Sequence, residues 1–290
     1  MNTTKRARLF LILSMAAFGT LAPFVRKIAV SSGELALYRA VLASLLIGGF
    51  LILTKQKLDF RSLKKELLLL LLSGIAMGFN WILLFEAYKY TTVAIATLSY
   101  YFAPVLVTLV CPLLFHEKLT KKQILCFVMS TLGLALVIGI TNLGSGGNDA
   151  IGIAFGLGAA VLYATVILLN KFIKGVTGIH RTFLQFLAAI AVLIPYVLLT
   201  GGMHLDSLNV TGWTCLLIVG LVHTGITYCL YFTSLKELSG QEAAILSYMD
   251  PLVAVVIGVL VLKEPLGWQQ LVGGLLILGF TLLNELDTGK

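Results

Sequence analysis

Ten long apolar stretches follow one another along the chain with little polar sequence between them. In hydrocarbon the backbone must bond to itself, so a helix of about 20 apolar residues is the unit that crosses a bilayer. Only 12% of the 290 residues are charged, against roughly 25% in soluble domains. We therefore predict an all-α integral membrane protein with ten transmembrane helices near residues 9–29, 34–54, 67–88, 92–115, 122–141, 150–173, 181–200, 211–234, 240–262 and 266–285.

Lysine and arginine residues are sorted between alternate loops. If the N-terminus is inside, most of the 21 basic residues fall on the inner side, and only a few, such as Arg26, Lys89 and Lys263, fall on the other. This bias predicts a multi-pass protein of the cell membrane with both termini in the cytoplasm. Because the charge follows the loops and not one face, we expect the lipid bilayer as a partner and no nucleic acid.

An internal repeat covers the chain. Residues 96–123 and 243–270 align without a gap, and the alignment places Pro104 on Pro251 and Glu117 on Glu264. Proline and glutamate are rare in apolar stretches, so this match is not a matter of composition. Five spans in each half make an odd number, so the second half is inverted in the membrane relative to the first. We predict two inverted five-helix repeats, residues 1–141 and 150–290, joined by a linker at 142–149.

Two prolines mark expected helix breaks. Pro104 and Pro251 lie inside apolar spans, and each lacks the N–H that would bond the carbonyl four residues back. The carbonyls of Tyr100 and Ser247 would then be free to face protein, water or ligand. A kink that serves only helix packing is the alternative.

Asp250 is the acidic residue expected deepest in the membrane. It lies about ten residues into the ninth span, where burying it costs a few kcal/mol, and the repeat has Ala103 in its place. Tyr101 and Tyr248 are the aligned residues beside it. We predict that Asp250 binds a substrate or a proton; an aspartate bonded to a neighbouring helix is the alternative.

Other polar and aromatic residues fall at membrane depth. Arg39 is explained either by a cavity or by snorkelling to the surface, and His223 either by a proton relay or by a hydrogen-bonded core. Asn80 and Trp81 align with a threonine and Tyr228, which suits a cavity wall or simple packing. The candidate substrate-binding residues are therefore Asp250, Tyr101, Tyr248, Tyr100, Trp81, Asn80, Tyr228, Arg39 and His223, with Pro104 and Pro251 as helix breaks.

Several conspicuous residues have structural explanations. Ser31–Glu34 and Ser239–Glu242 have the spacing of capping boxes, and the four cysteines lie inside predicted spans without metal-ligand spacing. His116–Glu117 lacks the second histidine of a zinc-protease helix. We expect no catalytic residues, no metal and no cofactor.

The chain resembles the EamA branch of the drug/metabolite transporter superfamily. The resemblance rests on the two five-span halves, the run A-x-x-x-x-Y-x-x-P in each, the H-E-K-L and K-E-P-L motifs at 116–119 and 263–266, and Tyr38–Arg39. It implies a transporter, often an exporter, of amino acids, other small metabolites or drugs, working by alternating access. It does not imply one mode of coupling.

These observations give one main hypothesis and two alternatives. The main one is a secondary transporter, expected to export an amino acid, an amine or a similar small molecule, with Asp250 holding an amine and Arg39 a polar group. A proton on Asp250 or His223 is a candidate coupling ion. The alternatives are a membrane-embedded enzyme acting on a lipid-linked substrate and a structural scaffold; an enzyme would need clustered catalytic groups, whereas the loops offer mostly lysine and arginine.

Overall fold

The chain is helical throughout the part that the computed structural model describes, which comprises residues 3–55, 60–115, 120–138, 149–176, 178–238, 243 and 246–285. Outside it lie most of the predicted linker, the H-E-K-L motif at 116–119 and the predicted capping box at 239–242. The first half contains α1 (Thr3–Gly19), α2 (Leu21–Val25), α3 (Ser32–Leu53), α4 (Phe60–Tyr90), α5 (Val93–Tyr100), α6 (Ala103–Phe115) and α7 (Lys121–Ile138).

The second half contains α8 (Asp149–Phe172), α9 (Gly178–Thr200), the short 3-10 helix η1 (Leu205–Ser207), α10 (Val210–Leu217), the π-helix η2 (Ile218–Ile226), α11 (Thr227–Leu235), α13 (Met249–Leu260) and α14 (Trp268–Glu285). Some spans consist of consecutive elements: α1 and α2 form one span, α5 and α6 another, and α10, η2 and α11 a third. The helices therefore occupy all ten predicted positions.

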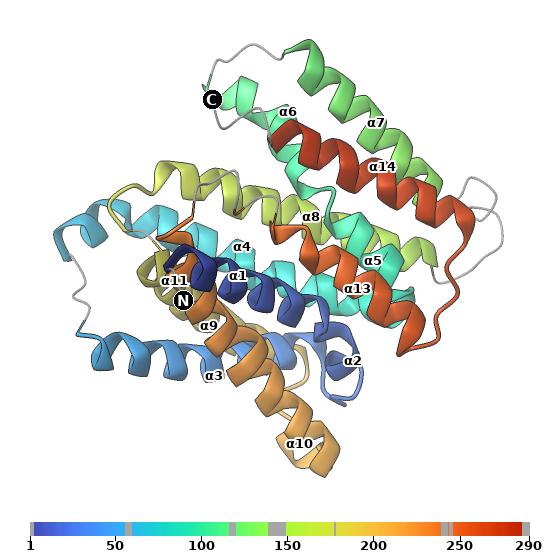
Figure 1. The fold of residues 1–290 in the computed structure, drawn as a ribbon. Helices are drawn as coiled ribbons and strands as arrows, with labels where there is room; N and C mark the ends of the chain where they lie inside the picture. The colour runs from blue at the N-terminus through green and yellow to red at the C-terminus, as the bar shows by residue number, and fades with distance from the viewer. Residues whose placement is uncertain are drawn as a thin grey trace.

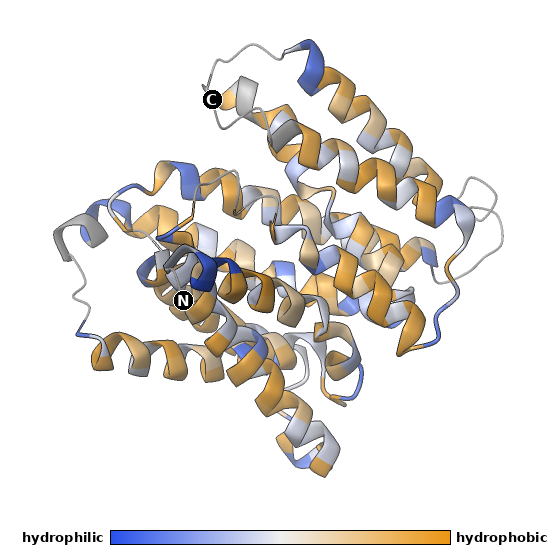
Figure 2. Ribbon diagram, viewed as in Figure 1, coloured by the Kyte–Doolittle hydropathy of each residue, from blue (hydrophilic) through white to orange (hydrophobic). Residues whose placement is uncertain are grey.

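The lengths and the apolar composition of the helices agree with a location in the membrane. Apolar residues run along most helices, and hydrophilic ones gather at the ends and in the loops (Figure 2). The predicted all-α membrane fold is confirmed. Among the described residues, six helices are long and apolar enough to cross a membrane, at Ser32–Leu53, Lys64–Tyr90, Val93–Val110, Asp149–Phe172, Gly178–Thr200 and Val210–Leu235, with shorter apolar helices at Met249–Leu260 and Trp268–Leu283.

The packing of the spans has an approximate two-fold symmetry. The α4–α8 contact corresponds to the α1–α11 contact, the α4–α9 contact to the α3–η2 contact, and the α5–α8 contact to the α1–α13 contact. The pairs α3–α9, α5–α13 and α7–α14 are their own counterparts. Exchanging the two halves thus reproduces these contacts, as expected of a repeat. The α7–α14 pair lies at one edge of the bundle, away from α3 (Figure 1).

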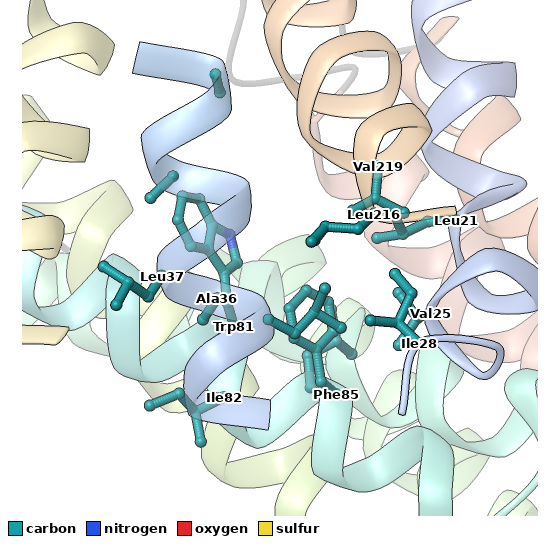
Figure 3. Packing of buried hydrophobic residues seen from close by; sticks show 14 of the residues in the cluster. Leu21, Val25, Ile28, Ala36, Leu37, Trp81, Ile82, Phe85, Leu216 and Val219 are labelled. Atoms are coloured by element: carbon teal, nitrogen blue, oxygen red, sulfur yellow. The ribbon is translucent and has the colours of Figure 1, made fainter. Parts of the chain in front are cut away.

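The largest apolar core lies where α3, α4, α9 and the η2 span meet. Figure 3 shows Phe85 of α4 close to Val25 and Ile28 in this core. Helices approach closely where glycine lies at the contact: a Cβ on Gly74 would lie 2.5 Å from Cβ of Ala188. Small residues are what allow membrane helices to pack this tightly.

Three spans are interrupted near their middle. α5 ends at Tyr100 and α6 begins at Ala103, so Pro104 falls in the first turn of a new helix, where its missing N–H costs nothing. α13 begins at Met249, which places Pro251 in its first turn in the same way. The first span breaks at Thr20, between α1 and α2. The breaks predicted from the two prolines are thus present.

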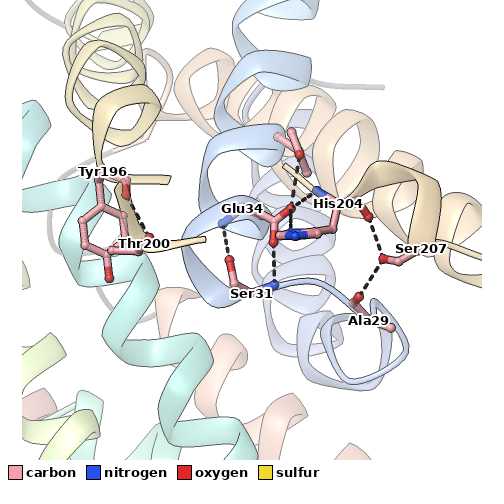
Figure 4. Close-up of polar contacts among 8 residues, drawn as sticks. Ala29, Ser31, Glu34, Tyr196, Thr200, His204 and Ser207 are labelled. Atoms are coloured by element: carbon pink, nitrogen blue, oxygen red, sulfur yellow. Dashed lines mark hydrogen bonds and ion pairs between the residues drawn. The ribbon is translucent and has the colours of Figure 1, made fainter. Parts of the chain in front are cut away.

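Glu34 caps α3 as predicted. Its carboxylate accepts the backbone N–H of Ser31, and the Ser31 hydroxyl accepts the N–H of Glu34. The same carboxylate accepts the backbone N–H of His204 (Figure 4). Glu34 therefore anchors the loop that follows α9 to the start of α3, which is a structural role.

Candidate functional site

Arg39 is buried in the core with only 4% of its surface exposed. It lies two turns into α3, and its Nε–H donates to Thr224 Oγ1 on η2 over 2.7 Å. The guanidinium carbon lies 4.7 Å from the ring centroid of Trp81 and 5.6 Å from that of Phe85, within the range of cation–π attraction. The side chain points into the protein, so it does not snorkel to the surface.

The guanidinium of Arg39 has more hydrogen-bond donors than the described residues use. Of its five N–H donors, one bonds Thr224, and no other described residue accepts a hydrogen bond from the rest. The terminal nitrogens of Arg39 are therefore suited to a polar group that the protein does not itself supply, such as a carboxylate.

Asp250 lies in the first turn of α13 and contacts the other broken span, α5–α6. The Tyr101 hydroxyl donates to Asp250 Oδ2 over 2.6 Å, so the residue at the α5–α6 break holds the acid at the start of α13. No described residue donates to Oδ1. The counterpart position in the repeat, Ala103, is fully buried and carries no charge.

Aromatic rings lie near each of the two charges, in two groups. On the Arg39 side, Phe186 packs edge-on against Trp81 and Tyr228, with centroids 5.1 and 5.3 Å apart. On the Asp250 side, Tyr100 packs against Tyr101, with centroids 5.9 Å apart. Tyr100 and Tyr228 are each within electrostatic range of both Arg39 and Asp250. The structure thus brings six predicted residues into one region: Arg39, Trp81, Tyr100, Tyr101, Tyr228 and Asp250.

The remaining three predicted residues lie differently. Asn80 donates to the carbonyl of Ala159 over 2.6 Å, so its amide joins α4 to α8. Tyr248 is 9% exposed and lies just before α13. His223 lies on η2, next to Thr224, with its Nε2 3.0 Å from the Thr20 hydroxyl.

A cavity of about 520 Å³ opens beside this region. None of the nine candidate residues lines it. Phe85 connects the two, since it lines the cavity and lies beneath the Arg39 guanidinium. The ring of Phe85 therefore lies between the cavity and the Arg39 guanidinium. Its lining residues are Val25, Arg26, Ile28, Val30, Ser32, Leu35, Phe85, Tyr88 and Lys89.

Arg26 and Glu264 form an ion pair at this end of the bundle. The Arg26 guanidinium bonds Glu264 Oε1 and also donates to the carbonyls of Tyr88 and Thr91. Glu264 Oε2 accepts the N–H of Val93, the first residue of α5, over 2.8 Å. The pair ties the first span to the α4–α5 turn and to the end of the ninth span. The repeated E-x-L motif signals Glu264, but its partner is not evident from sequence.

Sequence reasoning misses other residues of the region. Thr224 bonds Arg39, and Thr20 bonds His223. Threonine is common in membrane helices, so neither residue stands out in the sequence. The π-helix that presents His223 and Thr224 likewise leaves no recognisable mark in the sequence.

Two repeated halves of membrane helices enclosing a polar, aromatic-lined region define a membrane transporter. The chain belongs to the EamA-like transporter family, whose pattern matches residues 5–139 and 150–285. It is thus a member of a transporter family and not of an enzyme family, as the sequence resemblance implies.

Relatives and a solved structure agree with this assignment. The chain is 33% identical over 254 residues to the uncharacterized transporter YxxF of Bacillus subtilis, covering 85% of this chain and 79% of the relative. It is 28% identical over 277 residues to an uncharacterized transporter of Archaeoglobus fulgidus, with 94% of each covered. Protein PecM of Dickeya dadantii is 26% identical over 219 residues, 75% of this chain and 73% of PecM. A crystal structure with 18% identity superposes with a TM-score of 0.63 over 95% of this chain and 96% of that one, which shows a shared fold.

Proposed function

We propose that this transporter exports a small zwitterion of the amino-acid type across the cell membrane by alternating access. The observation that carries the proposal is the placement of opposite charges on opposite halves. Arg39 lies in the first repeat and Asp250 in the second, with aromatic rings around both. Secondary transporters built from inverted repeats bind their substrates near the midplane, where the repeats meet.

Each charge has the chemistry for one end of such a substrate. A guanidinium with free terminal N–H groups binds a carboxylate through two parallel hydrogen bonds. A carboxylate held by one oxygen, as Tyr101 holds Asp250, leaves the other oxygen for an ammonium group. The aromatic rings supply apolar walls for the side chain of the substrate and attract its cationic end.

A proton is the coupling ion that this arrangement supports. Asp250 binds either an ammonium group or a proton, because both neutralise the same carboxylate. Exchange of a proton for the amine at Asp250 would link substrate movement to the proton gradient. The excess of lysine and arginine in alternate loops supports a cytoplasmic location for both termini, and the direction of export rests on the family resemblance.

Three probes that share a phenyl ring but differ in charge separate the two ends of the substrate. Phenylalanine carries both charges, phenethylamine carries only the amine, and phenylacetate carries only the carboxylate. Binding to the purified protein in nanodiscs is measured by calorimetry. We expect Asp250→Asn to weaken phenethylamine at least tenfold with little effect on phenylacetate, and Arg39→Gln to do the reverse.

Matched controls come from charges elsewhere in the chain. Asp149→Asn removes an acid that bonds Thr91 at the end of the bundle, and Arg181→Gln removes an arginine that bonds the Asn170 carbonyl. Both variants should bind all three probes as the unmodified protein does. The proposal would be overturned if none of the three probes bound, or if Asp250→Asn and Arg39→Gln had the same effect on the binding of each probe.

A further inference from the structure

Two irregular stretches of backbone meet at His223 and Thr20. Thr20 lies at the break between α1 and α2, and His223 lies within the π-helix η2. Their counterparts in the repeat, α8 and α4, are unbroken helices. The irregularity thus occurs on one side of the two-fold only. Segments of π-helix in α-helical spans are often found at functional sites.

The π-helix aims two adjacent side chains at different partners. Its wider turn brings side chains opposite the carbonyl five residues back: His223 Nδ1 lies 3.3 Å from the Ile218 oxygen, and the Thr224 hydroxyl donates to the Val219 oxygen over 2.7 Å. Thr224 also accepts from Arg39, while His223 faces Thr20. The imidazole and the guanidinium are therefore linked through neighbouring residues of one element.

The contacts around His223 suit both of its protonation states. A carbonyl oxygen only accepts, so Nδ1 must carry a hydrogen towards Ile218. Nε2 lies 3.0 Å from the Thr20 hydroxyl, which itself lies 2.9 Å from the Ala17 carbonyl oxygen. When His223 is neutral, the single hydroxyl hydrogen of Thr20 points to Nε2. When a proton from solvent binds Nε2, that N–H donates to Thr20, whose hydroxyl hydrogen turns to Ala17, and no heavy atom needs to move.

Arg39 is the charged residue that acts on the His223 imidazole. It interacts electrostatically with the imidazole, and two like charges in a medium of low dielectric constant repel strongly. An anion bound to the guanidinium cancels this repulsion. The ring of Phe24 packs against the imidazole, with centroids 4.9 Å apart. The charged and titratable groups on the elements packed against η2 are Lys5, Arg6, Arg8, Glu34, Tyr38, Arg39, Cys215, Tyr228, Cys229 and Tyr231, and Arg26 directly follows α2.

We infer that His223 is a proton-binding site coupled to the anion site at Arg39, so that a carboxylate and a proton bind together. The inference rests on the proposed function, in which that carboxylate belongs to the substrate. Because coupling is reciprocal, the carboxylate promotes proton uptake by as much as the proton promotes carboxylate binding. This effect is opposite in sign to that at Asp250, where proton and ammonium group compete.

Phenylacetate binding with simultaneous measurement of proton uptake tests the inference. The purified protein is titrated with phenylacetate in weakly buffered solution between about pH 5.5 and 8, with a pH indicator reporting proton uptake. We expect uptake approaching one proton per phenylacetate and an affinity that rises as the pH falls. His223→Gln keeps an N–H that can donate to Thr20 but does not titrate, so uptake and pH dependence should both be lost.

The controls separate this inference from the proposed function. His204→Gln, at the end of the bundle, should behave as the unmodified protein does. Phenethylamine should bind His223→Gln normally and more weakly at low pH. Phenylacetate binding that depends on Arg39 but takes up no proton would overturn the role of His223 and leave the proposed function intact. Absence of phenylacetate binding at every pH would overturn this inference, and if phenylalanine and phenethylamine also failed to bind, the proposed function would fall with it.

Discussion

Glu264 joins the two halves of the bundle through Arg26. The side chain of Glu264 is only 10% exposed and that of Arg26 30%, so solvent screens the pair less than an exposed ion pair. Each partner has further bonds, Glu264 to the N–H of Val93 and Arg26 to two carbonyls. The pair is therefore a fixed connection between the ninth span and the α4–α5 turn of the other half.

Removing this connection should destabilise the protein. Exposed ion pairs contribute up to about 1 kcal/mol and breaking buried ones costs about 3–5 kcal/mol, so we expect Glu264→Gln to cost roughly 1–3 kcal/mol. A double-mutant cycle with Arg26→Gln, measured by reversible unfolding in mixed micelles, isolates the coupling. Lys89→Gln, which breaks the Glu86–Lys89 pair on a single helix, is the control with a small effect. Additive losses would contradict the assigned contact.

Tyr101 should position Asp250 for the amine. Tyr101→Phe removes the hydroxyl that donates to Asp250 Oδ2 and leaves the ring in place. Losing one hydrogen bond costs about 0.5–1.5 kcal/mol, which corresponds to about two- to tenfold in affinity. We therefore expect Tyr101→Phe to bind phenethylamine more weakly by this factor. Phenylacetate affinity should not change. An equal loss for both probes would point to a general structural effect.

Close helix packing should make some glycines irreplaceable. A Cβ at Gly74 would lie 2.5 Å from both the Ala188 Cβ and the Gln185 oxygen, whereas one at Gly49 meets nothing within 4 Å. Overpacking typically costs about 1–3 kcal/mol. We expect Gly74→Ala to lower the thermal unfolding temperature clearly and Gly49→Ala to leave it nearly unchanged. Similar behaviour of the two variants would argue against the α4–α9 contact.

The charge bias predicts that both ends of the chain are cytoplasmic. A green fluorescent protein fused after Lys290 should fluoresce, because that protein folds in the cytoplasm, and alkaline phosphatase at the same place should be inactive. A fusion in the 89–92 turn should give the reverse pattern. Active phosphatase at the C-terminus would invert the proposed orientation.

The helices and their order follow from the sequence because the bilayer leaves the chain few choices. Long apolar runs must form helices in hydrocarbon, and an aligned pair of prolines is enough to locate two of the breaks. The Ser31–Glu34 cap is equally local, since it depends only on residues three apart. Features set within one span are therefore the ones that the sequence predicts.

Contacts between spans are harder to predict. The burial of Arg39 can be suspected from its depth, but its bond to Thr224 depends on which face of the eighth span turns towards α3. The same holds for His223 and Thr20, which are far apart in sequence. The cavity beside Phe85 arises from the shapes of several spans together and has no counterpart in any single motif.

The symmetry of the bundle bears on the energies of its two end states. If both halves were identical, a two-fold rotation about an axis in the membrane plane would convert the state open to one side into the state open to the other, and the two would have equal free energy. Among the described residues, the bond of Tyr101 to Asp250 has no counterpart, because Ala103 stands at the position that matches Asp250, and the π-helix of the eighth span corresponds to the unbroken α4. The bond of Arg39 to Thr224 corresponds to that of Gln185 to Ser73, in which the donor is uncharged. In the proposed alternating-access cycle these differences remove that degeneracy, so we expect the empty transporter to prefer one of its two orientations.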